Sequence, residues 1–161
     1  MFQLKYKTLL NLILLFSIFA LGAAYFVQYI LKHEPCNLCL IERLPYIFSI
    51  LVIILLLIIQ KYERYAFILL SLIFIIATIL SFYHFGIEQG FFKESAFCFA
   101  SNETSNLSSE ELLNELQKKT ISCRDVSFKF FGLSLTSINM IASIALSIIT
   151  IKAFLNYEKN R

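Results

Sequence analysis

The sequence contains no tryptophan and has only four glycines and two prolines in 161 residues, which excludes long flexible linkers. Charged residues are also scarce, because they make up 16% of the chain, whereas hydrophobic residues make up 58%. Ordinary soluble domains have about 25% charged residues, and a chain this apolar would expose too much hydrophobic surface in water. The composition therefore excludes a soluble enzyme and a disordered tail. The net charge of +3 is small and scattered, so nucleic acid is not an expected partner.

Long apolar runs are abundant instead. A helix needs about 20 apolar residues to cross about 30 Å of hydrocarbon, and four stretches of the chain meet this requirement. Backbone polar groups in lipid must be satisfied within their own segment, so each stretch is predicted to be a helix. The predicted spans cover residues 8–30, 39–59, 66–85 and 132–151. We therefore expect an all-α integral membrane protein, with residues 1–161 forming a single transmembrane domain and a four-helix bundle.

The start of the second span is decided by its length. A helix that began at Pro45 would be only about 22 Å long, whereas one that begins at Cys39 spans about 31 Å and fits the bilayer. This start places Glu42 and Arg43 in the first turns of the helix, at the membrane edge. Pro45 is expected to kink the helix or to mark an irregular turn.

Lysine and arginine are concentrated on one side of the predicted membrane. They are dense next to both termini and in the short loop between the second and third spans, and sparse in the loops over 31–38 and 86–131. Cytoplasmic segments carry such an excess, so both termini are predicted to be cytoplasmic and the two longer loops to face outward. The basic residues on the predicted inner side are Lys5, Lys7, Lys61, Arg64, Lys152, Lys159 and Arg161.

All four cysteines fall on the predicted outer side. Cys36 and Cys39 lie between the first two spans, and Cys98 and Cys123 lie between the last two. Disulfides form and persist in such oxidising compartments. Four cysteines allow three connectivities, of which the natural one joins the two cysteines within each loop.

Cys36-Asn37-Leu38-Cys39 is a C-x-x-C motif at the predicted start of a helix. The helix dipole is expected to lower the pKa of the first thiol, and the nearby Arg43 should add to this effect. Thiolates are the attacking species in disulfide exchange, so a redox-active pair is the favoured interpretation. A structural disulfide and half of a zinc site remain alternatives. Zinc would need a second close pair, and the other two cysteines are far apart in sequence, so no metal is expected.

The segment between Cys98 and Cys123 is polar, and a disulfide there could transfer electrons or simply stiffen the loop. Within it, Ser108 and Glu111 have the spacing of a capping box. The residues that follow indicate a short amphipathic helix, which covers the bundle, lies on the membrane surface or docks a partner. Its apolar stripe and its basic last turn are formed by Leu112, Leu113, Leu116, Lys118 and Lys119.

His84 and Glu88 are four residues apart near the end of the third span. This spacing is compatible with a metal pair or a proton relay. An ordinary hydrogen bond at the end of the helix is the simpler alternative.

The motif from Cys36 to Arg43 resembles the signature of the DsbB family, which comprises bacterial inner-membrane disulfide bond formation proteins. Two further stretches are similar to the end of the third span and the approach to the fourth span in that family. The resemblance covers nearly the whole chain and includes the related DsbI branch. These stretches are Tyr83-His84-Phe85-Gly86-Ile87-Glu88-Gln89-Gly90, and Cys123-Arg124-Asp125-Val126 followed by Gly132-Leu133-Ser134-Leu135 and Asn139.

The resemblance implies a thiol:quinone oxidoreductase in the bacterial inner membrane. A reduced periplasmic partner, a DsbA-like thioredoxin-fold protein, would attack the loop disulfide at Cys98, whose bond to Cys123 breaks. Electrons would pass to the Cys36–Cys39 pair, and Cys39 would face a bound ubiquinone or menaquinone. A mobile acceptor in the lipid is expected on physical grounds too, because cysteines alone would soon fill with electrons.

Arg43 is the residue that the resemblance associates with the quinone. An arginine at this depth is costly without a partner, and the alternatives to a quinone carbonyl are Glu42 and a lipid phosphate. The chain departs from the family in lacking tryptophan, because Phe91, Phe92 and Phe128 stand where many members have tryptophan.

Two other functions remain open at this point. A non-enzymatic membrane scaffold would use the cysteines as structural disulfides, and its partner would be oxidised equally well without Cys36 or Cys39. A carrier that exports reductant would prefer cysteines within the spans or on both sides of the membrane, and the predicted topology places none there.

Overall fold

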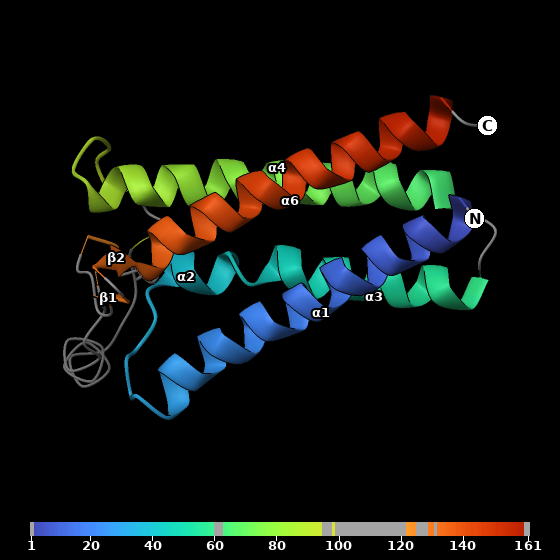
Figure 1. Cartoon of the computed structure of the whole chain (residues 1–161). Coiled ribbons are helices and arrows are strands. Elements are labelled where there is room, and N and C mark those ends of the chain that lie inside the picture. Colours follow the sequence, from blue (N-terminus) through green and yellow to red (C-terminus); the bar gives the residue numbers. More distant parts are fainter. Residues whose placement is uncertain are drawn as a thin grey trace, which may run out of the picture.

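The computed structural model is a bundle of four long helices that run side by side (Figure 1). It describes residues 2–59, 63–94, 98, 122–124, 129–130 and 132–159. The long helices are α1 (Phe2–Tyr29), α3 (Leu44–Ile59), α4 (Glu63–Glu88) and α6 (Leu135–Lys159), and the short elements are α2 (Asn37–Ile41), β1 (Lys129–Phe130) and β2 (Leu133–Ser134). The predicted amphipathic helix over 108–119 lies outside the described residues.

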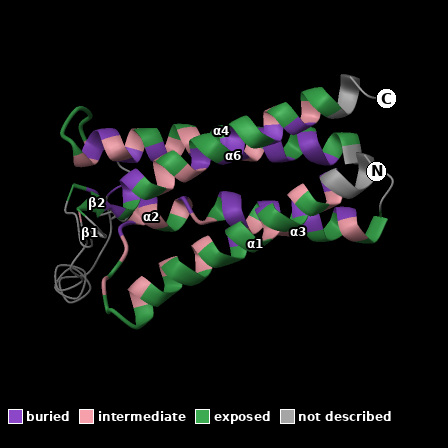
Figure 2. Ribbon diagram, viewed as in Figure 1, coloured by how far each residue is buried: buried purple, intermediate pink, exposed green. Residues whose placement is uncertain are grey.

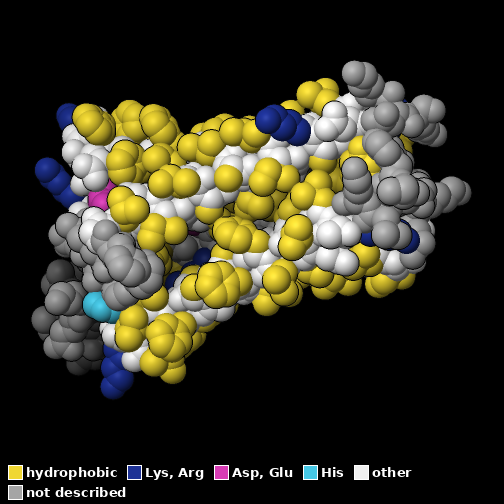
Figure 3. All heavy atoms as spheres, in the orientation of Figure 1, with side chains coloured by type: hydrophobic (Ala, Val, Ile, Leu, Met, Phe, Trp, Pro, Cys, Tyr) yellow, Lys and Arg dark blue, Asp and Glu magenta, His cyan; other side chains and the backbone are white. Residues whose placement is uncertain are grey.

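Within the described residues, four helical segments are long and apolar enough to cross a membrane: Tyr6–Tyr29, Asn37–Ile59, Arg64–Glu88 and Leu135–Asn156. Large hydrophobic side chains are exposed along all of them, and they cover most of the face shown in Figure 3. Lipid is the environment in which such a surface is stable. The prediction of an all-α, multi-pass membrane protein is therefore confirmed.

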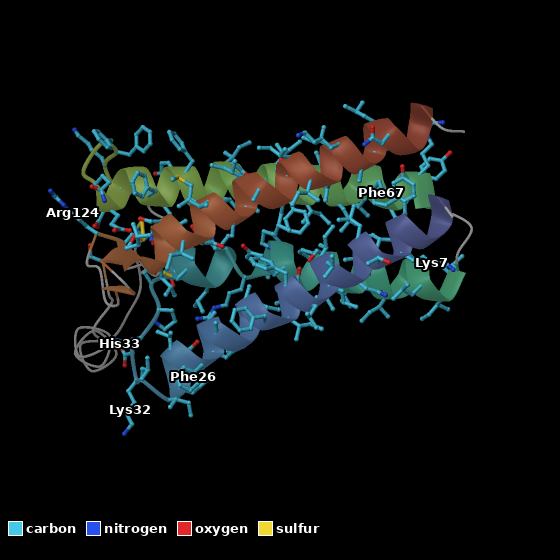
Figure 4. All side chains as sticks on the ribbon, in the orientation of Figure 1. Lys7, Phe26, Lys32, His33, Phe67 and Arg124 are labelled. Atoms are coloured by element: carbon cyan, nitrogen blue, oxygen red, sulfur yellow. A yellow bond between two sulfur atoms is a disulfide. The ribbon has the colours of Figure 1, made fainter. Side chains whose placement is uncertain are left out.

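The bundle has two distinct ends. Both termini lie at one end, and α2, β1 and β2 lie at the other (Figure 1). Lys7 is near the first end, whereas Lys32 and Arg124 are at the second (Figure 4). We call the second end the α2 end.

The second membrane span is interrupted. α2 ends at Ile41 and α3 begins at Leu44, so Glu42 and Arg43 form a two-residue turn instead of lying within a continuous helix. Pro45 explains the break, because proline has no N–H to donate to the carbonyl of Ile41 and its ring crowds that carbonyl. Of the two outcomes expected for Pro45, the irregular turn is the one that occurs.

Strands β1 and β2 pair antiparallel, with Lys129 opposite Ser134 and Phe130 opposite Leu133. Gly132 in the connecting turn has a φ of 83°, a conformation that glycine adopts without steric cost. Strands of two residues carry too little periodicity to be predicted from the sequence. The pair leads the chain directly into α6 at the α2 end.

Buried residues face into the bundle along α3, α4 and α6, whereas those of α1 lie only in its N-terminal part, up to Ser17 (Figure 2). The larger apolar cluster includes Tyr46, Phe67 and Phe74. Between α1 and α3, the hydroxyl oxygens of Ser17 and Ser49 lie 3.0 Å apart, and Ser17 also donates to the carbonyl of Ile13. Such small polar contacts hold membrane helices together, because lipid provides no hydrophobic force between them.

Candidate functional site

Cys36 and Cys39 lie side by side at the start of α2. Cys36 is the N-cap residue, with extended φ and ψ of −71° and 167°, and its sulfur accepts a hydrogen bond from the backbone N–H of Cys39 at 3.3 Å. The two sulfur atoms are 2.8 Å apart. Cys36 is buried and Cys39 is half-buried. The C-x-x-C spacing thus brings both sulfurs to one side of the first turn, close enough for a disulfide to form between them.

The other two cysteines form a disulfide, Cys98–Cys123, with 5.5 Å between their Cα atoms. Both residues are buried, and they pack with Cys36, Leu38 and Ile87 in one apolar cluster. The disulfide is drawn as a yellow bond close to Arg124 at the α2 end (Figure 4). All four cysteines of the chain are therefore gathered at one end of the bundle.

A buried carboxylate–histidine pair lies against Cys36. The Nδ1 atom of His84, from α4, is 3.0 Å from Oε1 of Glu42, and its Nε2 atom is 3.5 Å from the sulfur of Cys36. His84 is 2% exposed and Glu42 is 8% exposed. The sequence spacing had suggested Glu88 as the partner of His84. The structure instead directs both ring nitrogens toward residues that are more than 40 positions away in sequence.

Asn139 of α6 connects this pair to the rest of the bundle. Its Nδ2 donates to Oε2 of Glu42 at 2.9 Å and to the hydroxyl of Ser81 at 2.8 Å, and its Oδ1 accepts from the hydroxyl of Tyr46 at 2.6 Å. One amide thus joins α3, α4, α6 and the turn after α2. Because polar groups inside a bilayer must find partners within the protein, this network fixes the position of the Glu42 carboxylate.

The surroundings of Cys36 favour its thiolate. The hydrogen bond from the Cys39 side chain is the largest cause and lowers the pKa of the Cys36 thiol, burial opposes this change, and the His84 imidazole supports it. The resulting pKa is about 5, against an ordinary value of 9.0. Arg43, which the sequence suggested as a cause, is not among these contributions, and the imidazole of His84 takes that place.

The ultraviolet absorbance of the thiolate checks this assignment in reduced protein that lacks the loop cysteines, Cys98→Ala/Cys123→Ala. We expect the thiolate of Cys36 to appear as the pH rises through about 5. Replacing Cys39 with alanine removes the main hydrogen-bond donor and should move the titration toward 9, whereas serine keeps a donor and should move it less. A titration near the ordinary thiol value in the parent protein would contradict the assignment.

Arg43 has its partners on α1. Its Nη1 donates to Oε1 of Gln28 at 2.6 Å, and its guanidinium lies 4.9 Å from the ring centre of Tyr25. The expected internal alternative, Glu42, is engaged by His84 and Asn139 instead. A guanidinium has five N–H donors, so these contacts leave donor capacity at the membrane edge.

The sequence identified the cysteines but not the polar residues that organise them. The sequence pattern does not indicate that Glu42 and His84 form a pair. The sequence assigns no role to Gln28 and does not connect Asn139 with the cysteines. The usable signal is that polar side chains are rare within apolar spans and need partners there.

Comparisons with known proteins show which chains this one is similar to. The family model described as "Disulfide bond formation protein DsbB" matches residues 6–153. An uncharacterized protein from Rickettsia prowazekii (strain Madrid E) is 34% identical over 146 residues, which covers 89% of this chain and 85% of that protein.

Proposed function

We propose that this chain, which belongs to the DsbB family of disulfide bond formation proteins, transfers electrons from a reduced periplasmic partner protein to quinone in the bacterial inner membrane. Membership of the family implies disulfide formation by thiol oxidation. The observation that carries the finer proposal is the gathering of all four cysteines at the α2 end. There the Cys98–Cys123 disulfide packs in the same buried cluster as Cys36.

The first exchange takes place at the loop disulfide. A thiolate of a DsbA-like, thioredoxin-fold partner attacks Cys98, the bond to Cys123 breaks, and Cys123 leaves as a thiolate. The second thiol of the partner then attacks the mixed disulfide and displaces Cys98. The partner leaves oxidised, and two thiols remain on the loop.

The second exchange passes the same two electrons inward. The loop thiols attack the Cys36–Cys39 disulfide, so that Cys98–Cys123 forms again and the inner pair becomes a dithiol. The backbone N–H of Cys39 and the imidazole of His84 contact the Cys36 sulfur, and they stabilise the thiolate that is released when the inner bond breaks. A leaving thiol of low pKa departs faster. The Glu42–His84 pair can also hold a proton next to this sulfur.

The residues at the turn after α2 fit a quinone. Cys39 and Arg43 are both half-buried, and the apolar residues beside them, Leu40 and Leu44, are 42% and 46% exposed. Ubiquinone or menaquinone, when bound there, would supply an acceptor for two electrons and two protons. Arg43 would hold it through the donors that Gln28 does not use.

The arrangement of the ends supports an orientation with both termini in the cytoplasm. The termini lie together at the end opposite the cysteines (Figure 1). This orientation puts the segments rich in lysine and arginine on the cytoplasmic side and the cysteines in the oxidising periplasm, as the general rules for both predict. We propose that residues 1–161 act as one transmembrane domain with the α2 end in the periplasm.

The alternative functions are less well supported. A reductant carrier would prefer cysteines within the spans or on both sides of the membrane, whereas all four lie at one end of the bundle. A scaffold with structural disulfides has no use for a buried carboxylate–histidine pair against one sulfur, because burying such groups costs free energy.

The test is a turnover assay with the purified full-length protein, a reduced DsbA-like partner and added quinone. We expect partner oxidation that depends on quinone and stops when quinone is left out. Oxidation of the partner at the same rate without quinone would overturn the proposal.

Replacing Arg43 with alanine should raise the apparent KM for quinone by about 10- to 100-fold with a smaller change in kcat, which corresponds to the loss of a charged hydrogen bond of about 1.5–3 kcal/mol. Lys32, an exposed cation of the loop at the same end, provides the matched control, and Lys32→Ala should leave the KM unchanged. An unchanged KM in Arg43→Ala would mean that Arg43 serves only to attach α1 through Gln28.

A further inference from the structure

We infer that Cys36, Cys39 and His84 form a binding site for a thiophilic divalent cation such as Zn²⁺ while the cysteine pair is reduced. The bound cation would keep the pair reduced and block electron transfer. The cation site is inferred from geometry alone, whereas the block of electron transfer rests on the proposed function.

The ligand atoms are already close to metal-binding distances. The two sulfurs and Nε2 of His84 all lie within 4.8 Å of one another. In a tetrahedral zinc site, bond lengths of about 2.3 Å to sulfur and about 2.0 Å to nitrogen place sulfur and nitrogen about 3.5 Å apart and two sulfurs about 3.8 Å apart. The 3.5 Å separation between Cys36 and His84 fits directly. The sulfurs, now 2.8 Å apart, must separate by about 1 Å, and of the two cysteines Cys39 is the one that is not fully buried.

Glu42 provides an independent indication of a metal site. Its carboxylate lies at Nδ1 of His84 and accepts the N–H of that nitrogen, so Nε2, which faces the sulfur of Cys36, can give up its own proton and bind a cation. Histidines that bind metals almost always donate their other N–H to such an acceptor. Asn139 in turn fixes the carboxylate, so the imidazole is held in position before any cation arrives.

The ligand set favours soft cations. Two thiolates and one imidazole are ligands for Zn²⁺ or Cd²⁺, whereas Mg²⁺ and Ca²⁺ prefer oxygen. The sequence argued against zinc because a second cysteine pair was missing, but the fold supplies a histidine from α4 as the third ligand. Three protein ligands leave the fourth position of a tetrahedral site open, whereas structural zinc sites fill all four positions with protein ligands.

Occupancy would depend on the redox state. Cation binding to the dithiol releases two protons to solvent, and no electrons are transferred, because the sulfurs remain reduced. Oxidation of the pair joins the two sulfurs and removes both thiolate ligands. A bound cation and the Cys36–Cys39 disulfide therefore exclude each other.

The direct experiment measures Cd²⁺ binding to the full-length Cys98→Ala/Cys123→Ala protein in detergent, where only Cys36 and Cys39 carry thiols. We expect one Cd²⁺ per reduced protein, together with thiolate-to-cadmium charge-transfer absorbance in the ultraviolet, and displacement of the cadmium by Zn²⁺. The same sample after oxidation should bind none. Both samples contain the same polypeptide, so a difference between them comes from the redox state of Cys36 and Cys39. The absence of stoichiometric binding in the reduced sample would overturn the inference.

Variants test the two supporting residues. Glu42→Gln should weaken Cd²⁺ binding by about 10- to 100-fold, as expected for a residue that orients a metal ligand, and His84→Ala should weaken it at least as much. His33, the other histidine of the chain, lies in the loop after α1 (Figure 4) and is the matched control, so His33→Ala should bind normally. Unchanged affinity in His84→Ala would mean that the cysteines bind alone and would overturn the three-residue site.

The binding measurement needs neither partner nor quinone, so it separates the inference from the proposed function. If the reduced protein binds no cation and its turnover is insensitive to Zn²⁺, the inference is overturned and the proposed function stands. Stoichiometric binding without turnover supports the site and overturns the function. Binding together with inhibition by Zn²⁺ that a chelator reverses supports both.

Discussion

Replacing Cys39 with alanine is expected to abolish quinone-dependent oxidation of the partner, because one remaining sulfur cannot form the inner disulfide. Cys36→Ala should have the same effect for the same reason. The measurement is turnover with reduced partner and quinone, and activity should fall below detection in both proteins. His33→Ala, in the loop just before Cys36, should retain full activity. Normal turnover in either cysteine variant would favour the scaffold function.

The loop disulfide gives a companion result that locates the entry point. Cys98→Ala/Cys123→Ala should also fail to oxidise the protein partner. A small dithiol can reach the inner pair without the loop, because Cys39 is half-buried and not fully enclosed. Quinone reduction by such a dithiol should therefore persist in this variant. Its loss would mean that the loop cysteines are needed for more than contact with the partner.

Replacing Glu42 with leucine is expected to destabilise the protein strongly. The Nδ1 of His84 loses its acceptor, and the Nδ2 of Asn139 keeps only Ser81 of its two acceptors. Each N–H that is left buried and unsatisfied costs about 1–3 kcal/mol. The measurement is thermal unfolding of the detergent-solubilised protein, in which each kcal/mol corresponds to roughly 2–4 °C for a chain of this size.

Glu42→Gln is the matched variant for this experiment. Glutamine can still accept from Asn139 through its oxygen and can donate to His84 through its nitrogen, so most of the stability should remain. The imidazole would then carry its proton on the nitrogen that faces Cys36. If leucine and glutamine gave the same unfolding temperature, the carboxylate would not be the acceptor that holds this network together.

The bundle could be predicted because its cause is local. Each span is an apolar run whose length alone matches the bilayer, so no knowledge of distant residues is needed. The irregular turn at Pro45 was one of the two predicted outcomes, because proline disrupts the helix in which it lies. Strands β1 and β2 were missed because two residues cannot show a period.

The organisation of the site could not be predicted in the same way, because its contacts join distant segments. His84 lies 42 positions from Glu42, and Asn139 lies 97 positions from it. Spacing along one helix suggested Glu88 for His84, but the packing of α4 against neighbouring elements decided otherwise. For Arg43, the sequence considered partners on its own helix or in the lipid, and the partner in the structure is Gln28 on the preceding helix.

The break between α2 and α3 also determines the direction in which the ionisable side chains of the second span point around its axis. In an unbroken helix each residue advances by about 100°, so straightening the segment would rotate Glu42 and Arg43 relative to the C-x-x-C motif. The carboxylate of Glu42, which now faces α4, and the guanidinium of Arg43, which now faces α1, would then both lose their present partners. The pyrrolidine ring of Pro45, by breaking the helix, thus keeps two neighbouring charged side chains directed at different helices.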